Sequence, residues 1–321
     1  IVLNNLFCAT QDVAIDSLAV STLKENERGR GNGFMFAGQY VGIALGGGVA
    51  VFVYGLFGFG VALAYISSLL LINLMFVLFF VYDPEANPLA ERQSHVFRKL
   101  VVSMTSFVRE VYESFWKSGT GPMVGVLFAL LPTGAIALAY ATLGTLQVDY
   151  GLTENQIAEL RIYNTVASAL GCVCGGLMGD RFGAKRIVAM SYGLTAVPTA
   201  LLGFQIAQLG LQSVPLGTFY GLIIAHGVVY GMAFGVRNAI FMGMTNPAVA
   251  ATQFTAFMGM SNLAISVGNY WQGVVAERFD YSTVLYFDAL IAVSVILVIP
   301  FLRKREAPVV PPTIEPVPAK T

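Results

Sequence analysis

The sequence predicts an all-α membrane protein that crosses the bilayer several times. Of its 321 residues 56% are hydrophobic and 11% are charged, and the mean hydropathy is +0.71, whereas soluble domains carry about 25% charged residues. No stretch alternates apolar and polar residues over ~10 positions, as membrane β-barrel strands do. About 20 apolar residues form a helix that crosses the ~30 Å hydrocarbon core. Nine such segments are predicted, at 1–23, 34–57, 60–82, 122–148, 156–179, 187–210, 215–243, 252–276 and 283–302.

Basic residues predict the orientation of these segments. If the first segment ends in the cytoplasm, alternation leaves only Arg278 in the opposite loops, while Arg161 and Arg237 fall inside segments. An excess of Lys and Arg is typical of cytoplasmic loops, so the C-terminus is predicted to be cytoplasmic. The cytoplasmic loops and tail hold Lys24, Arg28, Arg30, Arg92, Arg98, Lys99, Arg109, Lys117, Arg181, Lys185, Arg186, Arg303, Lys304, Arg305 and Lys320.

Polarity divides the chain into four parts. Residues 1–83 hold three apolar segments, and 122–306 hold six. Between them, 84–121 form a cytoplasmic linker with an amphipathic pattern, which predicts a helix either on the membrane surface or packed under the bundle. The proline-rich tail, 307–321, has too little apolar surface to fold and is predicted to be disordered.

The first three segments resemble the last three. A shift of 221 positions places Gly38 on Gly259, Gly47 on Gly268 and Phe36 on Phe257. Such a parallel duplication is typical of transporters built from two halves.

Two carboxylates lie inside the first apolar segment. Asp12 and Asp16 are one helical turn apart and so share a face. An acid within the membrane usually faces a cavity or a partner, and two close carboxylates raise the pKa of one of them, which suits a proton carrier. The alternative is a structural pair that helix-end donors satisfy.

Further polar residues within the segments are candidate substrate contacts. Arg237, followed by Asn238, is the shifted equivalent of Asp16 and could pair with it, bind an anionic substrate or extend to the interface. Arg161 could contact substrate or pair with nearby glutamates. Gln39 and Tyr40 add polarity to the second segment. No metal-ligating cluster, cofactor motif or nucleophile motif is visible, so the sequence predicts neither an enzyme nor a nucleic-acid partner.

Two glycine series have four-residue spacing, which lets helices approach closely. Gly38, Gly42 and Gly46 lie in the second segment, and Gly171, Gly175 and Gly179 lie in the fifth. They predict either a sliding seam between the two halves or static packing.

The stretch 175–186 joins two apolar segments by a short polar loop. It follows the pattern G-x-x-x-D-R-x-G-x-[KR]-[KR], which resembles the loop signature of the major facilitator superfamily of secondary transporters. Gly183 allows a tight turn, and Asp180 can bridge to bases or to helix ends. We expect a cytoplasmic gate loop that comprises Gly179, Asp180, Arg181, Gly183, Lys185 and Arg186.

Residues 8–48 and 243–275 resemble one branch of that superfamily. Ala9-Thr10-Gln11-Asp12-Val13-Ala14-Ile15-Asp16 and Glu27-Arg28-Gly29 are similar to motifs of the AmpG muropeptide permeases and the related acetyl-CoA transporters. The resemblance implies twelve helices, of which this chain would hold four to twelve, and assigns the acidic pair to Asp12 and Asp16. The branch often has an arginine where this chain has Tyr40.

Together these features predict a secondary transporter of the bacterial cytoplasmic membrane. The expected activity is proton-coupled import of an anhydro-muropeptide-like or other amphiphilic anion, by a monomer in the lipid bilayer without a cofactor. Two alternatives stay open: a transporter-like sensor or scaffold without transport, and a chain complete with nine helices.

Overall fold

The described part of the chain is entirely helical in its regular structure, which confirms the all-α class. The structure is a computed structural model that describes residues 2–81, 109, 112, 115–116, 120–131, 136–245 and 250–302. The tail at 307–321 and most of the linker at 84–121 lie outside these residues, so their predicted organisation stays a prediction.

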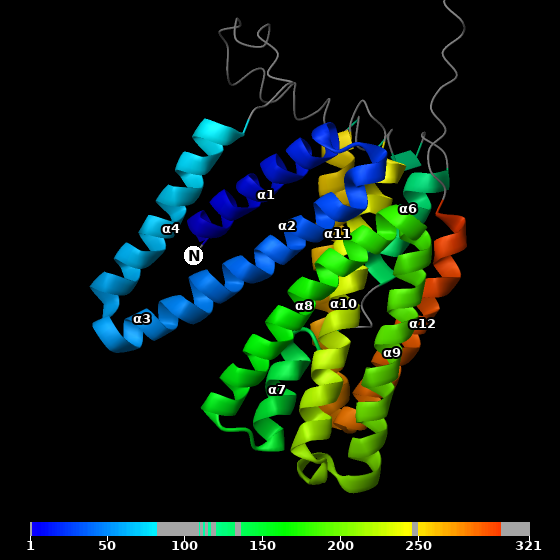
Figure 1. The fold of residues 1–321 in the computed structure, drawn as a ribbon. Coiled ribbons are helices and arrows are strands. Elements are labelled where there is room, and N and C mark those ends of the chain that lie inside the picture. Colours follow the sequence, from blue (N-terminus) through cyan, green and yellow to red (C-terminus); the bar gives the residue numbers. More distant parts are fainter. Residues whose placement is uncertain are drawn as a thin grey trace, which may run out of the picture.

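The N-terminal helices form an arm that turns back between α1 and α2 and again at Gly58 (Figure 1). Gly58, with φ of 81°, separates the last two of them. The long second helix contains a π-helical turn, which divides it into α2 and α3. The elements are α1 (Val2–Thr22), a 3₁₀ turn (Glu25–Glu27), α2 (Arg28–Ile43), the π turn (Ala44–Val49), α3 (Ala50–Phe57) and α4 (Phe59–Phe80).

The C-terminal helices form a bundle with short connections. A capping box at Thr153 and Gln156 starts α8, because each side chain bonds the backbone of the other. The helices are α6 (Thr120–Leu130), α7 (Ala141–Tyr150), α8 (Glu154–Phe182), α9 (Ala184–Leu209), α10 (Leu216–Met244), α11 (Ala250–Arg278) and α12 (Tyr281–Val298). Short 3₁₀ turns follow α9 (Leu211–Ser213) and α12 (Ile299–Phe301).

The segment 122–148, predicted as one helix, is two helices in the structure. α6 ends at Leu130, and α7 begins at Ala141 after a turn at 136–140. The single-helix prediction was therefore wrong. Pro132 lies in the intervening sequence, and a proline ends helices because it lacks the N–H donor and clashes with the preceding turn.

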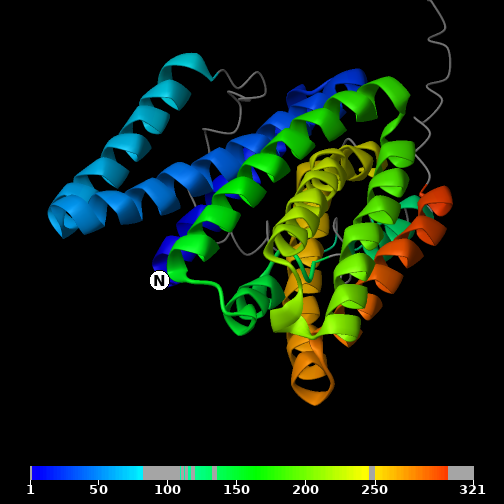
Figure 2. The same cartoon turned by 60° about the horizontal axis from the view of Figure 1, so that its bottom comes forward.

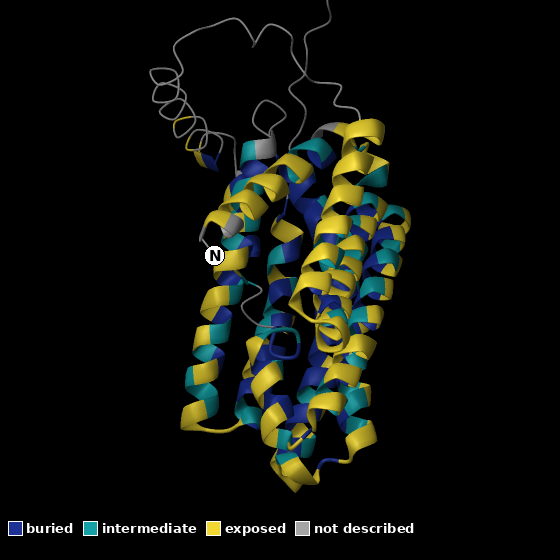
Figure 3. Cartoon of the chain, turned by 90° about the vertical axis from the view of Figure 1, so that its left-hand side faces the viewer, coloured by how far each residue is buried: buried dark blue, intermediate teal, exposed yellow. Residues whose placement is uncertain are grey.

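Six helices of the described residues are long and apolar enough to span a membrane. They correspond to six of the nine predicted segments; α1 and α11 are long but fall outside this set. Apolar side chains face outward on the arm, with Phe79 76% and Phe80 75% exposed. Figure 3 shows exposed residues along the outer helix surfaces and buried residues inside the bundle. Such exposure of large apolar groups fits contact with lipid.

The helices converge at the end of the bundle where α8 turns into α9, here termed the loop end; the opposite end is termed the far end. At the loop end α2 packs against α8 and α10, and α1 packs against α11. Toward the far end α3 and α4 stand away from the C-terminal bundle (Figure 1, Figure 2). The two parts of the chain therefore meet at one end and separate toward the other.

Two buried apolar clusters fill the C-terminal bundle. One surrounds Phe128 and Phe241 toward the loop end, and the other surrounds Leu146 and Phe219 toward the far end. The helix bounds also follow the predicted repeat: shifted by 221 positions, α1, α2–α3 and α4 fall on 223–243, 249–278 and 280–301, which are the places of α10, α11 and α12.

Candidate functional site

The turn between α8 and α9 is the tight reversal that the sequence predicts. Gly183 has φ of 95°, a left-handed conformation in which a Cβ would be strained. Asp180 and Arg181 consequently lie in the last turn of α8, and Lys185 and Arg186 lie in the first turn of α9.

Asp180 bridges α8 to the start of α2. Its Oδ1 accepts from the Gly29 N–H at 2.8 Å, and its Oδ2 accepts from the Arg30 N–H at 2.9 Å. The first N–H groups of a helix have no partner within it, and the helix dipole favours an anion there. One carboxylate thus joins the C-terminal bundle to the arm. A helix end is one of the two kinds of partner that the sequence predicts for Asp180.

Arg28 makes a complementary contact in the other direction. Its Nη1 donates to the Met242 carbonyl oxygen at 3.1 Å, near the C-terminal end of α10. Asn32, which is fully buried one turn later, donates to the Arg28 carbonyl oxygen at 2.7 Å and to the Met242 sulfur at 3.4 Å. The start of α2 is therefore held by both α8 and α10.

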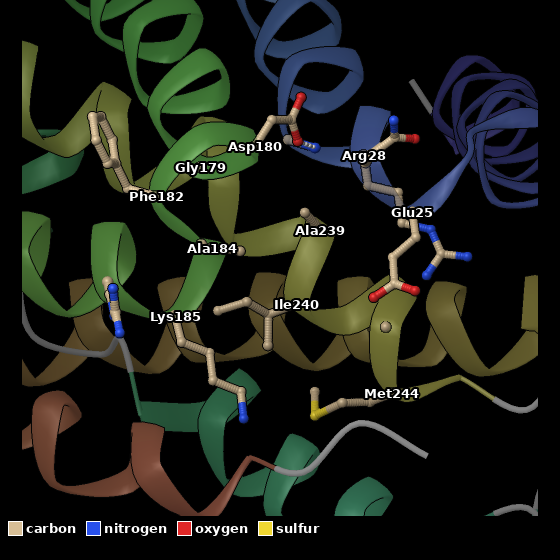
Figure 4. A pocket seen from close by; sticks show the side chains of 15 residues that line it. Glu25, Arg28, Gly179, Asp180, Phe182, Ala184, Lys185, Ala239, Ile240 and Met244 are labelled. Carbon is tan, nitrogen blue, oxygen red and sulfur yellow. Dashed lines mark hydrogen bonds between the residues drawn. The ribbon is translucent and has the colours of Figure 1, made fainter. Parts of the chain in front are cut away.

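A cavity of about 1180 Å³, termed the loop cavity, lies beside these contacts. Figure 4 shows Asp180 reaching toward α2, with side chains of α9 and α10 around the same space. Lys185 donates its Nζ to the Leu302 carbonyl oxygen, whereas Arg181 and Arg186 are exposed. The loop cavity is lined by residues that include Glu25, Arg28, Asp180, Phe182, Lys185, Arg186, Ile240 and Met244.

Glycines allow the backbones of α2 and α8 to touch. A Cβ added at Gly33 would lie 2.6 Å from the Cys172 carbonyl oxygen, and one at Gly176 would lie 2.5 Å from the Gly29 carbonyl oxygen. Both distances are too short for real carbon atoms, so only glycine fits. The close approach on α2 therefore uses Gly29 and Gly33.

The predicted seam residues of α2 do not make this approach. A Cβ at Gly38 or Gly42 of α2, or at Gly46 of the π turn, would meet nothing within 4 Å. Gly38 follows Gly33 by five residues, so Gly38, Gly42 and Gly46 lie on a different face of the helix from Gly29 and Gly33. In this structure the seam is displaced toward the loop end.

Most glycines of α8 contact α10 and not α2. Gly171 and Gly175 abut the α10 backbone at Val228 and Met232, and Gly179 abuts the Val236 side chain. In return, Gly227, Gly231 and Gly235 of α10 abut Asn164, Ser168 and Cys172 of α8. These contacts lie within the C-terminal bundle, whereas Gly176 faces the arm.

A second cavity of about 470 Å³, termed the polar cavity, lies between α2, α7, α8, α10 and α11. Two of the predicted substrate residues line it, Tyr40 from α2 and Arg161 from α8. It thus lies where the two parts of the chain face each other. Its other polar lining residues are Tyr140, Gln147, Asn164, Thr165, Ser168, His226, Tyr230 and Asn269.

Aromatic rings separate the polar cavity from the loop end. Phe36 of α2 packs on Phe234 of α10, with ring centroids 4.3 Å apart, and Tyr230 stacks on Phe234 at 5.8 Å. The Tyr230 and Tyr140 hydroxyl groups lie 3.3 Å apart at the cavity wall. These rings pack between α2 and α10 on the loop-end side of the polar cavity.

The other three predicted substrate residues do not line the polar cavity. Arg237 is 4% exposed and bonds the Ala129 carbonyl oxygen and the Ser261 hydroxyl, so it neither pairs with Asp16 nor extends to the interface. Asn238 is buried beside it, and Gln39 is exposed. The position of a residue along a segment does not show whether its side chain faces the interior of the bundle or the cavity wall.

Asp12 and Asp16 lie on α1, which packs against α11. Asp12 is exposed and Asp16 is half-buried, and neither lines the loop cavity or the polar cavity. Arg30, at the start of α2, forms an ion pair with Glu27 at 2.6 Å. The structure therefore does not bring the acidic pair to the polar cavity.

Several lining residues went unpredicted although the sequence holds a signal for them. Asn164, Thr165 and Ser168 follow the predicted Arg161 at three- and four-residue spacing, which places polar groups on one face of α8. His226 and Tyr230 do the same on α10 and stack at 5.6 Å. Among the described residues, no group of three His, Cys, Asp or Glu side chains is placed to hold a metal ion.

Comparison with known proteins agrees with this architecture. The family model described as Major Facilitator Superfamily matches residues 1–173 and 123–320. The chain is also 21% identical over 302 residues to an uncharacterized protein of Haemophilus influenzae, covering 89% of this chain and 67% of that protein. With matches that extend over almost its whole length, the chain belongs to the Major Facilitator Superfamily of secondary transporters.

Proposed function

We propose that this transporter imports an amphiphilic anion, of the anhydro-muropeptide type, together with protons. The observation that carries the proposal is the polar cavity between the arm and the C-terminal bundle, closed toward the loop end by protein contacts. A substrate site between two halves that is closed at one end fits transport by alternating access.

The lining of the polar cavity favours a neutral or anionic substrate. It includes three tyrosines, several amides and hydroxyls, and Arg161, and none of the described residues that line it is a carboxylate. Tyrosine rings pack against apolar or sugar surfaces while their hydroxyl groups form hydrogen bonds. A guanidinium group suits a carboxylate or phosphate because it can donate two parallel hydrogen bonds. Arg161 is therefore the proposed anion contact.

The loop end is the proposed gate. Opening it requires the Asp180 carboxylate to leave the first turn of α2 and Arg28 to leave the end of α10. The glycine contacts between α2 and α8 would separate in the same movement. In the proposed cycle, these contacts hold the substrate away from the loop end until the halves rock.

The proposed membrane is the cytoplasmic membrane of a bacterium, with the loop end and the C-terminus facing the cytoplasm. In the structure Lys24, Arg28, Arg30, Arg181, Lys185 and Arg186 all lie at the loop end, as the excess of basic residues on cytoplasmic sides requires. The proposed working unit is a monomer, because the polar cavity is formed by one chain.

Asp12 and Asp16 are the proposed proton carriers, supported by two adjacent carboxylates within an apolar helix. The test is uptake of labelled anhydro-muropeptide into proteoliposomes that contain the full-length protein, at several external pH values. Asp16→Asn is expected to reduce uptake to background and to remove its pH dependence, because the amide cannot carry a proton.

Glu154→Gln is the matched control, since this exposed carboxylate at the start of α8 lies outside both cavities. Unchanged uptake and unchanged pH dependence in Asp16→Asn would contradict the proton-carrier role. Wild-type vesicles that move neither solute nor protons would instead favour the sensor or scaffold alternative.

A further inference from the structure

A buried carboxylate of α12 binds the backbone of the turn that precedes α7. Asp288 of α12 is 0% exposed, and its Oδ1 accepts from the Ile136 N–H at 3.1 Å and from the Ala137 N–H at 3.3 Å. These backbone groups lie in the turn at 136–140 before α7. The carboxylate thus supplies one acceptor oxygen to both N–H groups.

Two amides of α11 extend this support into α7. Gln272 donates to the same Asp288 oxygen at 2.7 Å and accepts from the Thr142 hydroxyl at 2.8 Å. Asn269 accepts from the Ala141 N–H at 3.4 Å. Side chains from α11 and α12 therefore fix the turn and the start of α7.

The other side of the break is held by a buried cation. Arg237 donates to the Ala129 carbonyl oxygen at 3.1 Å, at the C-terminal end of α6, and lies over the Phe128 and Phe241 rings at 5.6 and 5.0 Å. A cation suits the negative end of a helix, and an anion suits free N–H groups. Both ends of the break thus meet a charge of the favourable sign.

The supported segment forms one wall of the polar cavity. Leu138, Ala139, Tyr140 and Ala141 all line it, directly after the two N–H groups that Asp288 binds. A buried carboxylate has a large desolvation cost, and apolar replacements of buried charges are often as stable or more stable. Stability alone therefore does not explain this carboxylate, and its contacts indicate a role in positioning the wall.

We propose that Asp288 is a positioning residue that sets the cavity wall at 138–141. It acts through an acceptor oxygen on the Ile136 and Ala137 N–H groups and, by way of Gln272, on Thr142. The wall's relevance to transport rests on the proposed function of the polar cavity. The wall's position can be measured without any substrate.

The test measures thiol accessibility of the full-length protein in nanodiscs. The native Cys8, Cys172 and Cys174 are replaced by alanine, Ala139→Cys places a reporter in the wall, and a fluorescent maleimide is the probe. Asp288→Ala is expected to change the labelling rate at position 139 about tenfold, as the loss of a buried hydrogen-bond acceptor implies. Asp288→Asn retains an acceptor oxygen and is expected to stay within about twofold.

A second reporter, Thr165→Cys, lies in the same cavity on α8 and is the control. Its labelling rate is expected to be the same in all backgrounds. No change at 139 in Asp288→Ala, equal changes at 139 and 165, or equal effects of Asp288→Asn and Asp288→Ala would each overturn the proposal.

If Asp288→Ala does not fold, Gln272→Leu gives the second measurement. It removes the link to Thr142 and leaves the backbone bonds of Asp288, so a smaller change, about threefold, is expected at 139 alone. An unchanged rate there would also overturn the proposal. A failed muropeptide uptake assay would affect the proposed function and leave these rates as they are.

Discussion

The two parts of α2 have similar glycine spacing and opposite surroundings. Near the loop end, Gly29 and Gly33 touch the α8 backbone, and the helix start is capped by Asp180. Further along, Gly38, Gly42 and Gly46 face open space. Small residues permit a close approach but do not by themselves create one. In this structure the close approach occurs where polar groups also join the helix ends.

Substitution at the two glycine sites tests this difference most strongly. Gly33→Leu is expected to lower the stability of the detergent-solubilised protein by about 2–3 kcal/mol, because its Cβ has no room beside Cys172. Gly38→Leu has open space and is expected to change it by less than about 1 kcal/mol. Thermal unfolding measures both. Equal losses would show that the far part of α2 is packed as tightly as the near part.

The Asp180 cap is expected to have the next largest effect. Asp180→Asn removes the charge and one acceptor oxygen from the start of α2, which weakens the contact by about 1–2 kcal/mol. Cys172 is a natural reporter because it is 0% exposed beneath this contact. With Cys8 and Cys174 replaced by serine, its labelling by maleimide is expected to accelerate roughly tenfold.

Arg181→Gln is the control within the same loop. Arg181 is exposed and lies over the neighbouring Phe182 ring at 5.4 Å, so the Cys172 rate is expected to stay unchanged. Acceleration in both variants would indicate a general effect of loop charge on the gate. If labelling of Cys172 were not accelerated in Asp180→Asn, the Asp180 cap would have no part in the proposed gate.

A carboxylate at the far end gives the smallest expected effect. Asp280 accepts from the Thr283 N–H at 2.7 Å at the start of α12, and the Thr283 hydrogen bonds lower the pKa of Asp280 below its usual value. This cap is local to one helix, whereas the Asp180 cap joins two parts of the chain. Asp280→Ala is expected to cost about 1 kcal/mol and to leave Cys172 labelling unchanged.

The pH dependence of this contribution has a definite sign. Because the pKa of Asp280 is lowered in the folded protein, its charged form stabilises the fold at pH values above the ordinary aspartate pKa. This stabilisation disappears as the pH falls through the folded-state pKa. The difference in melting temperature between wild type and Asp280→Ala should therefore shrink below about pH 4. A constant difference across that range would contradict the role of the charged form.

Much of the fold could be predicted because it depends on local sequence. Apolar length identified the membrane helices, and Gly183 identified the turn at the loop end. The break in 122–148 was missed, although Pro132 lies within it, because the prediction rested on apolar length. Its stability depends on Asp288 and Arg237, which lie far away in the chain. Of the predicted substrate contacts, Tyr40 and Arg161 line the polar cavity and Arg237 does not, because depth in a segment does not show the direction of a side chain.

The sequence by itself determined the helical membrane class, the repeat, and a turn in which Asp180 can reach a helix end. Each follows from composition or from spacing within a few residues. Only the tertiary structure decided which glycines touch, which polar residues face the polar cavity and which buried charge holds the break between α6 and α7. Those outcomes depend on the angle at which helices cross, and contacts between residues far apart in the chain set that angle.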